Sequence, residues 1–358
     1  MNDTAVPLLP YPAVSPYATG LLPLDNGHEM YFEECGNPHG LPVLFVHGGP
    51  GSCSSPMHRR LADPQRCRLI LFDQRGCGLS QPPGHLLANT SDHLVEDMTQ
   101  LRRHLGIDQW LIVGGSWGAG LALAFATAHP ETCLGLVLRG VFLGRPSDLD
   151  WFFQEAQQLL PRAWEAFAQA APLAQHSKLL EWLYRGLHEG TLTEQRECAQ
   201  AWSRWENDLS DRQVEYRHHN QHQTRDISTT EVAPYLAHDA QTAKSVRKYR
   251  LQSHYLHHQC FWEAIPLLQR IDAISTLPTA ILHGQLDWIC RPSAAWDLHK
   301  ALPASRLQWL PGCGHSPFEP LMAHAIASTV SHFVRHRNFT TWETNAGMNA
   351  RHSESAEL

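Results

Sequence analysis

The sequence predicts an α/β protein with a mostly parallel sheet, helices on both faces and an inserted helical lid. Short apolar runs, typical of buried parallel strands, recur at both ends of the chain and precede glycine-rich turns. Between them, residues 144–263 show helical spacing of apolar residues and no alternation of strands with helices. We therefore expect a core formed by residues 1–143 and 264–338, a lid at 144–263, and a disordered tail at 339–358.

Composition excludes several classes of protein. The chain has 358 residues, of which 43% are hydrophobic and 18% charged, as in globular proteins with a sizeable core. A net charge of −7 offers no basic surface for nucleic acid, and no apolar run reaches the roughly 18 to 20 residues of a membrane span. The nine cysteines are scattered without a C-x-x-C pair, and no secretory signal begins the chain. We expect a cytoplasmic protein without nucleic-acid or membrane partners.

The first part of the chain supplies the elements of the sheet in regular order. An Asp-Asn-Gly turn at residues 25–27 lies between two extended pieces and predicts a β-hairpin. Leucine and methionine at helical spacing predict one helix over residues 90–105. Buried strands are predicted at residues 42–46, 68–72, 110–113 and 134–138. Asp73 and Arg75 follow the second of these strands, and we expect them to brace neighbouring turns.

Ser116 is the candidate nucleophile. It stands in the sequence Gly114-Gly115-Ser116-Trp117-Gly118, between an apolar strand and a run of helix formers. A serine pinned on so tight a turn adopts unfavourable backbone angles and crowds its neighbours, which is why glycine is needed two residues to either side. The turn exposes the serine hydroxyl and directs the backbone N–H of Trp117, at a helix N-terminus, toward the same point.

A second glycine-rich loop is a candidate for binding an oxyanion. The strand at 42–46 runs into His47-Gly48-Gly49-Pro50-Gly51, and glycines allow the backbone to approach a ligand with its N–H groups free. A mobile loop without a role is the alternative for this segment taken alone. With Ser116 downstream, we expect the amides of Gly48, Gly49 and Trp117 to form an oxyanion hole.

An acid and a histidine complete a possible catalytic triad. Further strands are predicted at residues 279–284 and 307–310; Asp287 follows the first and His315 the second. Open α/β sheets bind their ligands at the carboxyl ends of the strands. Serine, then acid, then histidine, each just after a strand, is the order of the triad in the α/β-hydrolase fold. We therefore predict Ser116, Asp287 and His315 as the catalytic residues.

The 24 histidines raise the question of a metal site. Two groups are close in sequence, namely His218, His219 and His222, and then His254, His257 and His258. The first group lies in a polar segment without a convincing carboxylate or cysteine partner. We predict neither a metal nor a cofactor.

The chain resembles the proline iminopeptidase (prolyl aminopeptidase) family of α/β-hydrolases. The resemblance runs from about residue 20 to residue 325 and includes lid segments. It rests on the loop at 47–51, the serine motif at 114–118, and the segments 72–80, 138–142, 150–155 and 295–300. It implies release of an N-terminal proline from small peptides or amino-acid amides, without a cofactor. The alternatives are an esterase, thioesterase, amidase or acyltransferase using the same triad, or a non-catalytic binding protein of this fold.

The resemblance also implies which residues bind the substrate. In the family, lid glutamates bind the free amino group of the first residue, and Trp202-Ser203-Arg204-Trp205-Glu206 matches one such segment. A second family segment, Arg-x-Glu-x-His-Tyr, reads Arg250-Leu251-Gln252-Ser253-His254-Tyr255 here, so Gln252 replaces an expected glutamate. Phe152 and Phe153 follow Trp151 in the lid, and the family often carries tyrosine at one of these two positions. Cys290, three residues past Asp287, is a candidate for the same pocket or a buried spectator.

Overall fold

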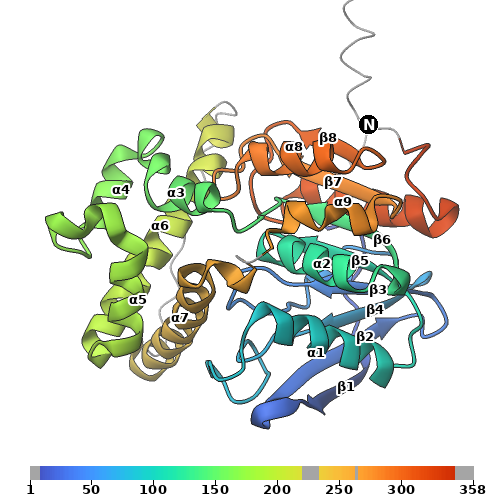
Figure 1. The fold of residues 1–358 in the computed structure, drawn as a ribbon, viewed down its shortest axis with the longest axis horizontal. Helices are drawn as coiled ribbons and strands as arrows, with labels where there is room; N and C mark the ends of the chain where they lie inside the picture. The colour runs from blue at the N-terminus through green and yellow to red at the C-terminus, as the bar shows by residue number, and fades with distance from the viewer. Residues whose placement is uncertain (1–8, 220–233, 263–264, 343–358) are drawn as a thin grey trace, which may run out of the picture.

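The computed structural model describes residues 9–219, 234–262 and 265–342, and its centre is one eight-stranded sheet (Figure 1). The strand order is β1-β2-β4-β3-β5-β6-β7-β8. The strands are β1 (Pro16–Pro23), β2 (Glu29–Gly36), β3 (Leu41–Val46), β4 (Cys67–Phe72), β5 (Trp110–Gly115), β6 (Cys133–Arg139), β7 (Thr279–Gly284) and β8 (Arg306–Leu310). Every strand predicted from the apolar runs is present.

The sheet is mostly parallel, as the sequence predicts. The turn at Asp25–Gly27 joins β1 and β2 as an antiparallel hairpin, and β2 also pairs antiparallel with β4. All pairings from β4 through β8 are parallel. The carboxyl ends of these strands therefore meet at one edge of the sheet, where the loops after β3, β5, β6, β7 and β8 come together.

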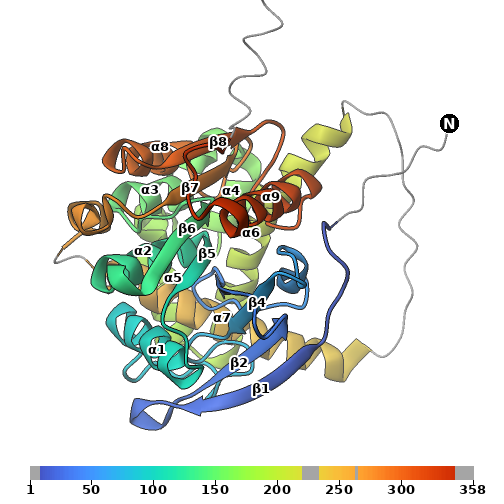
Figure 2. The same cartoon turned by 90° about the vertical axis from the view of Figure 1, so that its right-hand side faces the viewer.

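Helices cover both faces of the sheet (Figure 2). Consecutive residues of β3 point to opposite faces of the sheet. Leu44 packs in the cluster that includes α1 (Ser91–His104) and α2 (Trp117–Ala128), whereas Phe45 packs with α9 (Pro320–His336). Helix α8 (Pro292–Ala301) joins the layer of α1 and α2. The predicted helix at 90–105 is α1, and Thr90 caps its N-terminus.

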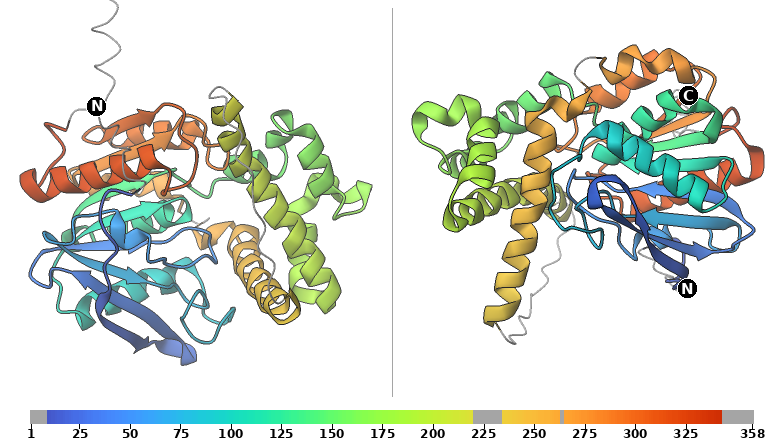
Figure 3. Two further views of the ribbon diagram at one scale, coloured as in Figure 1. Left: turned by 180° about the vertical axis from the view of Figure 1, so that it is seen from behind. Right: turned by 60° about the horizontal axis from the view of Figure 1, so that its bottom comes forward.

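The chain between β6 and β7 forms a separate group of helices beyond the edge of the sheet (Figures 1 and 3). They are α3 (Pro146–Phe153), α4 (Pro161–Ala168), α5 (Leu179–Glu189), α6 (Leu192–His219) and α7 (Pro234–His257). Aromatic side chains fill the space between them: Trp205 is fully buried, stacks on Phe167 and donates its indole N–H to the carbonyl of Phe152.

Polar contacts attach this helical group to the sheet domain. Trp151 in α3 donates its indole N–H to the carbonyl oxygen of Trp288, at 2.9 Å, and Arg145 forms an ion pair of 2.8 Å with Asp297 in α8. Since Trp288 adjoins Asp287, the first contact braces the loop that carries the predicted catalytic acid.

At the end of the described chain, Phe339 is buried and packs against Phe333 of α9, so residues 339–342 contact the core. The rest of the expected tail, residues 343–358, lies outside the described residues. Over the ranges that are described, no helix has the length and apolar content that crossing a bilayer would require.

Candidate active site

Ser116 lies on a sharp turn between β5 and α2. Its backbone angles are φ 58° and ψ −129°, a region that residues other than glycine rarely adopt, as the tight-turn argument expects. A side chain on Gly114 would overlap the carbonyl of Gly118, and one on Gly118 would overlap the carbonyl of Val46. Both glycines of the motif are therefore required by close backbone approach.

The loop after β3 is fastened to this turn by a buried hydrogen-bond network. The backbone N–H of Gln74 donates to Nε2 of His47 at 3.0 Å, and the Gln74 side-chain amide donates to the His47 carbonyl at 2.9 Å. Trp117 donates its indole N–H to Oε1 of Gln74, also at 2.9 Å. The Cα of Gly48 abuts Ser116, since a Cβ on Gly48 would lie 3.2 Å from the Ser116 Cβ.

Helix α2 begins at Trp117, directly after Ser116. Because Trp117 is the first residue of the helix, its backbone N–H has no acceptor within the helix. The network above therefore holds the predicted oxyanion residues beside the serine. Two further residues behave as expected: Asp73 accepts hydrogen bonds from the amide and hydroxyl of Ser54, and Arg75 pairs with Asp97 at 2.6 Å. Both brace turns at this edge of the sheet.

Asp287 and His315 are joined by a short hydrogen bond. Nδ1 of His315 lies 2.7 Å from Oδ2 of Asp287, and the amides of Ile289 and Cys290 donate to Oδ1 at 3.0 and 2.9 Å. Burial alone would raise the pKa of Asp287, but the charge and hydrogen bond of His315 and these backbone donors bring its pKa below the ordinary value. The carboxylate is therefore ionised and fixed in orientation.

Two residues at the end of β6 support this pair, and our sequence reasoning assigned them no role. The guanidinium of Arg139 donates to the carbonyl of His315 at 2.6 Å, and its burial lowers its pKa. Gly140, with φ 48°, leaves room for the pair: a Cβ there would lie 2.9 Å from Oδ2 of Asp287 and 3.2 Å from the His315 ring. A charged residue at the end of a buried strand and the glycine after it are the local signs of these positions, but they do not indicate the contact with His315.

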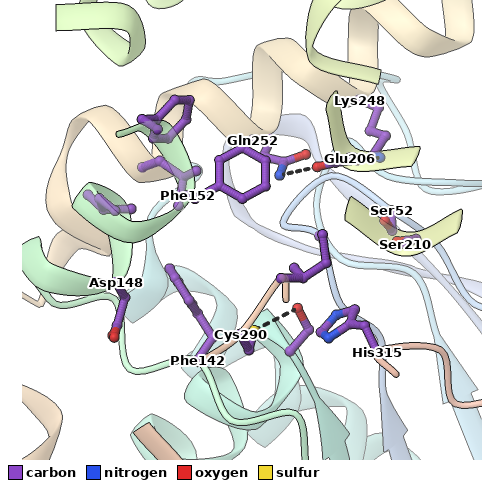
Figure 4. Close-up of a pocket in the computed structure, with 16 residues that line it drawn as sticks. Ser52, Phe142, Asp148, Phe152, Glu206, Ser210, Lys248, Gln252, Cys290 and His315 are labelled. Atoms are coloured by element: carbon purple, nitrogen blue, oxygen red, sulfur yellow. Dashed lines mark hydrogen bonds and ion pairs between the residues drawn. The ribbon is translucent and has the colours of Figure 1, made fainter. Parts of the chain in front are cut away.

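A cavity of about 180 Å³ separates the sheet from the helical group (Figure 4). Ser116, His315 and the loop residues Gly49 and Ser52 line it from the sheet domain. Its other lining residues are Phe142, Asp148, Leu149, Phe152, Phe153, Glu206, Ser210, Lys248, Gln252, Leu256, Ile289 and Cys290. The cavity thus brings together most of the predicted site residues, while Asp287 lies behind His315 and Gly48 and Trp117 lie behind Ser116.

The predicted aromatic and thiol positions form the apolar part of the wall. Phe152 and Phe153 pack edge to face, with ring centroids 5.0 Å apart. Sγ of Cys290 lies 3.9 Å from Oγ of Ser116, and burial raises the pKa of this thiol, so the cysteine presents a neutral S–H to the cavity. Phe142, which we did not predict, adds a third aromatic ring.

Glu206 and Gln252 meet on the lid side of the cavity, on α6 and α7. The Gln252 side-chain amide donates to Oε1 of Glu206 at 2.8 Å, whereas Oε1 of Gln252 is buried and has no hydrogen-bond partner among the described residues. Oε2 of Glu206 accepts from Nζ of Lys248 at 2.6 Å and from the hydroxyl of Tyr249 at 2.8 Å. Sequence reasoning missed Lys248, although its position four residues before Gln252 places both on one face of a helix.

Within the described ranges, no group of three or more His, Cys, Asp or Glu side chains is placed to bind a metal ion. His222 lies outside the described residues, as do the side chains of His218 and His219.

Comparisons with known proteins indicate the fold and the family of the chain. The family model of the alpha/beta hydrolase fold matches residues 42–320. A proline iminopeptidase of Xylella fastidiosa (strain Temecula1) is 40% identical over 326 residues, which cover 90% of this chain and 99% of the relative. A probable proline iminopeptidase of Leptolyngbya boryana is 39% identical, covering 90% and 96%. The crystal structure of a proline iminopeptidase-related protein of Thermus thermophilus is similar in fold, with a TM-score of 0.52, 20% identity, and coverage of 89% and 98%.

The sheet and the family match define an enzyme of the hydrolase class with the α/β-hydrolase fold. Within that class, the chain belongs to the proline iminopeptidase family.

Proposed function

We propose that this protein is a serine aminopeptidase that releases an N-terminal proline from small peptides or amides through an acyl-enzyme. One observation carries the proposal: the Asp287–His315 pair, with its contact of 2.7 Å, adjoins a cavity that also contains Ser116 and the lid carboxylate Glu206. A nucleophile, its base and a group that can bind an amine thus share one enclosed space.

Ser116 is the proposed nucleophile and His315 its general base. Because Nδ1 of His315 faces the ionised Asp287, the proton on this ring rests on Nδ1, and Nε2 is the nitrogen that accepts the serine proton. Oγ then bonds to the substrate carbonyl carbon. The negative charge that develops on the carbonyl oxygen is stabilised by the amides of Trp117 and of the Gly48–Gly49 turn, each donor contributing roughly 3 kcal/mol.

Collapse of the tetrahedral intermediate breaks the C–N bond. The imidazolium of His315 gives its proton to the leaving amine, which departs and leaves the acyl group on Ser116. A water molecule then gives a proton to His315 and attacks the ester carbonyl. His315 returns this proton to Oγ of Ser116 as the C–O bond breaks, which regenerates the serine and releases the carboxylic acid. Every step uses groups of this chain, the substrate and water.

The first residue of the substrate is proposed to occupy the cavity beneath the lid. Phe152 and Phe153 supply an apolar wall for a ring, and Glu206 with Oε1 of Gln252 supplies acceptors for the amine. An enclosed ammonium needs such acceptors, because burying it unpaired costs several kcal/mol.

A second candidate is an esterase acting on acyl groups that carry no amine. It is favoured by the contact between Lys248 and Glu206, which neutralises the carboxylate that an ammonium would need. Assays of a prolyl arylamide, an alanyl arylamide and the aryl ester of cyclopentanecarboxylic acid separate the candidates. We expect the highest kcat/KM among the amides for the prolyl substrate; turnover of the ester alone would refute the aminopeptidase proposal.

A further inference from the structure

The proposed function requires a carboxylate that is available to the substrate's amine, but the carboxylate of Glu206 is already paired with a lysine. Nζ of Lys248 lies 2.6 Å from Oε2 of Glu206 and 3.1 Å from the hydroxyl of Tyr249, in the wall of the cavity that contains Ser116 (Figure 4). With Gln252 donating to the other oxygen, both oxygens of the carboxylate are already hydrogen-bonded before any substrate enters.

We propose that Lys248 is a specificity-determining residue that competes with the substrate's ammonium for Glu206. This inference rests on the proposed function and names a residue that sets the preference of the same site. The charges at this end of the cavity support it: Glu206 and Lys248 sum to zero, so an ammonium entering beside Gln252 brings the occupied site to +1. The other carboxylate that lines the cavity, Asp148, is paired with Arg145 at 2.9 Å. In a largely enclosed site, that excess charge weakens amine binding.

Lys248 has room to be displaced. Its side chain is 30% exposed and also lines a neighbouring, larger cavity of about 510 Å³ bounded by the 51–53 and 76–78 loops. The ammonium of Lys248 can therefore move toward water when another cation takes its place. Lys248 therefore lowers the affinity for an amine without blocking the pocket. An acyl group that carries no amine enters while Lys248 and Glu206 remain paired.

The unpartnered oxygen of Gln252 marks where the substrate's nitrogen binds. Gln252 is 6% exposed, its Nε2 is held by Glu206, and its Oε1 has no partner in the described part of the chain. A buried acceptor without a donor is costly, and an N–H of the substrate would satisfy it. Because Nε2 of the same amide lies 2.8 Å from Oε1 of Glu206, a nitrogen bound at the Gln252 oxygen would lie near that carboxylate and share it with Lys248.

Two matched boronic acids measure the contribution of the amine directly. Pyrrolidine-2-boronic acid and cyclopentylboronic acid differ at the ring nitrogen, and each accepts an electron pair from Oγ of Ser116 to form a tetrahedral adduct. The ratio of their Kd values, measured by calorimetry, reports amine preference without requiring a known substrate. We expect Lys248→Met to raise the preference for the pyrrolidine about tenfold, which corresponds to about 1.4 kcal/mol.

Three variants complete the design. Lys248→Gln removes the charge but keeps a donor for Glu206, so it serves if Lys248→Met folds poorly. Lys244→Met removes an exposed lysine one turn away on α7, which lines the neighbouring cavity, and should leave the ratio unchanged. In a Glu206→Gln background, Lys248→Met should have a smaller effect, because the competition for the carboxylate is gone and only the direct repulsion between Lys248 and the amine remains.

A ratio that stays the same or falls in both Lys248 variants would overturn the inference. Failure of the proposed function looks different, because the wild type would then not hydrolyse prolyl amides while the two Kd values could still be measured and compared. If neither boronic acid binds to the wild type or to the Lys248 variants, both ideas are wrong.

Discussion

Oδ2 of Asp287 lies 2.7 Å from Nδ1 of His315, and the Cα of Gly140 packs directly against this pair. Asp287 comes from the loop after β7 and His315 from the loop after β8, whereas Gly140 directly follows β6. The acid, the base and the glycine that makes room for them therefore follow three neighbouring parallel strands.

Asp287→Asn should lower kcat by about a thousandfold or more. The carboxamide can still accept from the amides of Ile289 and Cys290, but it then turns an N–H toward Nδ1 of His315 and favours the wrong tautomer. Steady-state kinetics on a prolyl arylamide, with circular dichroism as a check on folding, measure the effect. A folded variant with more than about a tenth of the wild-type kcat would show that Asp287 does not orient the base.

Gly140→Ala should reduce kcat by more than its effect on the free energy of unfolding can explain. The added methyl would lie 2.9 Å from Oδ2 of Asp287 and push the pair apart, and the positive φ adds about 1 kcal/mol of strain. Gly106→Ala is the matched control, since Gly106 has φ 61° and its Cβ would meet no atom within 4 Å. Equal losses of activity in the two variants would contradict a role for the space at Gly140.

Gln252→Glu should raise kcat/KM on prolyl amides by about 5- to 30-fold. A second carboxylate brings the charge of the occupied site, with Lys248 and the substrate ammonium, from +1 to zero, and a charge-assisted hydrogen bond replaces a neutral one. The cyclopentanecarboxylate ester, which lacks the amine, should show no such gain. A decrease on the prolyl amide would indicate that Gln252 is suited to a different first residue.

Stability should fall as the pH drops from about 6.5 toward 4. Burial, with help from the cations Arg139 and Arg250, lowers the pKa values of His58 and His188 to about 4, against about 6.5 in an unfolded chain. Below about pH 6.5 the unfolded state binds protons that the folded state does not, so the free energy of unfolding falls with pH. Because both side chains keep some solvent contact, we expect a loss of about 1 to 2 kcal/mol by about pH 5.

Urea unfolding of the wild type and of His58→Gln at pH 7 and pH 5 isolates this term. The variant should lose less stability between the two pH values than the wild type does, because glutamine at position 58 binds no proton in the unfolded state. Equal losses would show that His58 titrates normally in the folded protein.

The sheet and the serine turn could be predicted from sequence because their causes are local. An apolar run flanked by glycines restricts the backbone whatever lies elsewhere, and the steric reasons for Gly114 and Gly118 are the ones that the motif implies. The helices α8 and α9 were not predicted, although each begins with a proline, a common first residue of a helix. In α9, Met322, Ile326, Val330 and Phe333 also recur at helical spacing.

The charge of the substrate pocket could not be predicted because it depends on tertiary contacts. Glu206 and Lys248 lie on different helices, 42 positions apart in sequence, and only their packing brings them within 2.6 Å. Likewise, nothing local to Arg139 indicates that its guanidinium would reach the carbonyl of His315, 176 positions away. The sequence thus named residues that line one cavity, whereas Lys248 and Arg139, which contact them, were missed.

The nucleophile is the central claim, and the kcat of Ser116→Ala on a prolyl arylamide tests it most directly. Alanine keeps the Cβ that already tolerates φ 58° at this turn, so the fold should persist, as thermal unfolding and circular dichroism would show. We predict that kcat falls to below about a hundredth of the wild-type value, with only the catalysis supplied by binding and the oxyanion donors remaining. A folded Ser116→Ala variant that retains more than that would contradict the account.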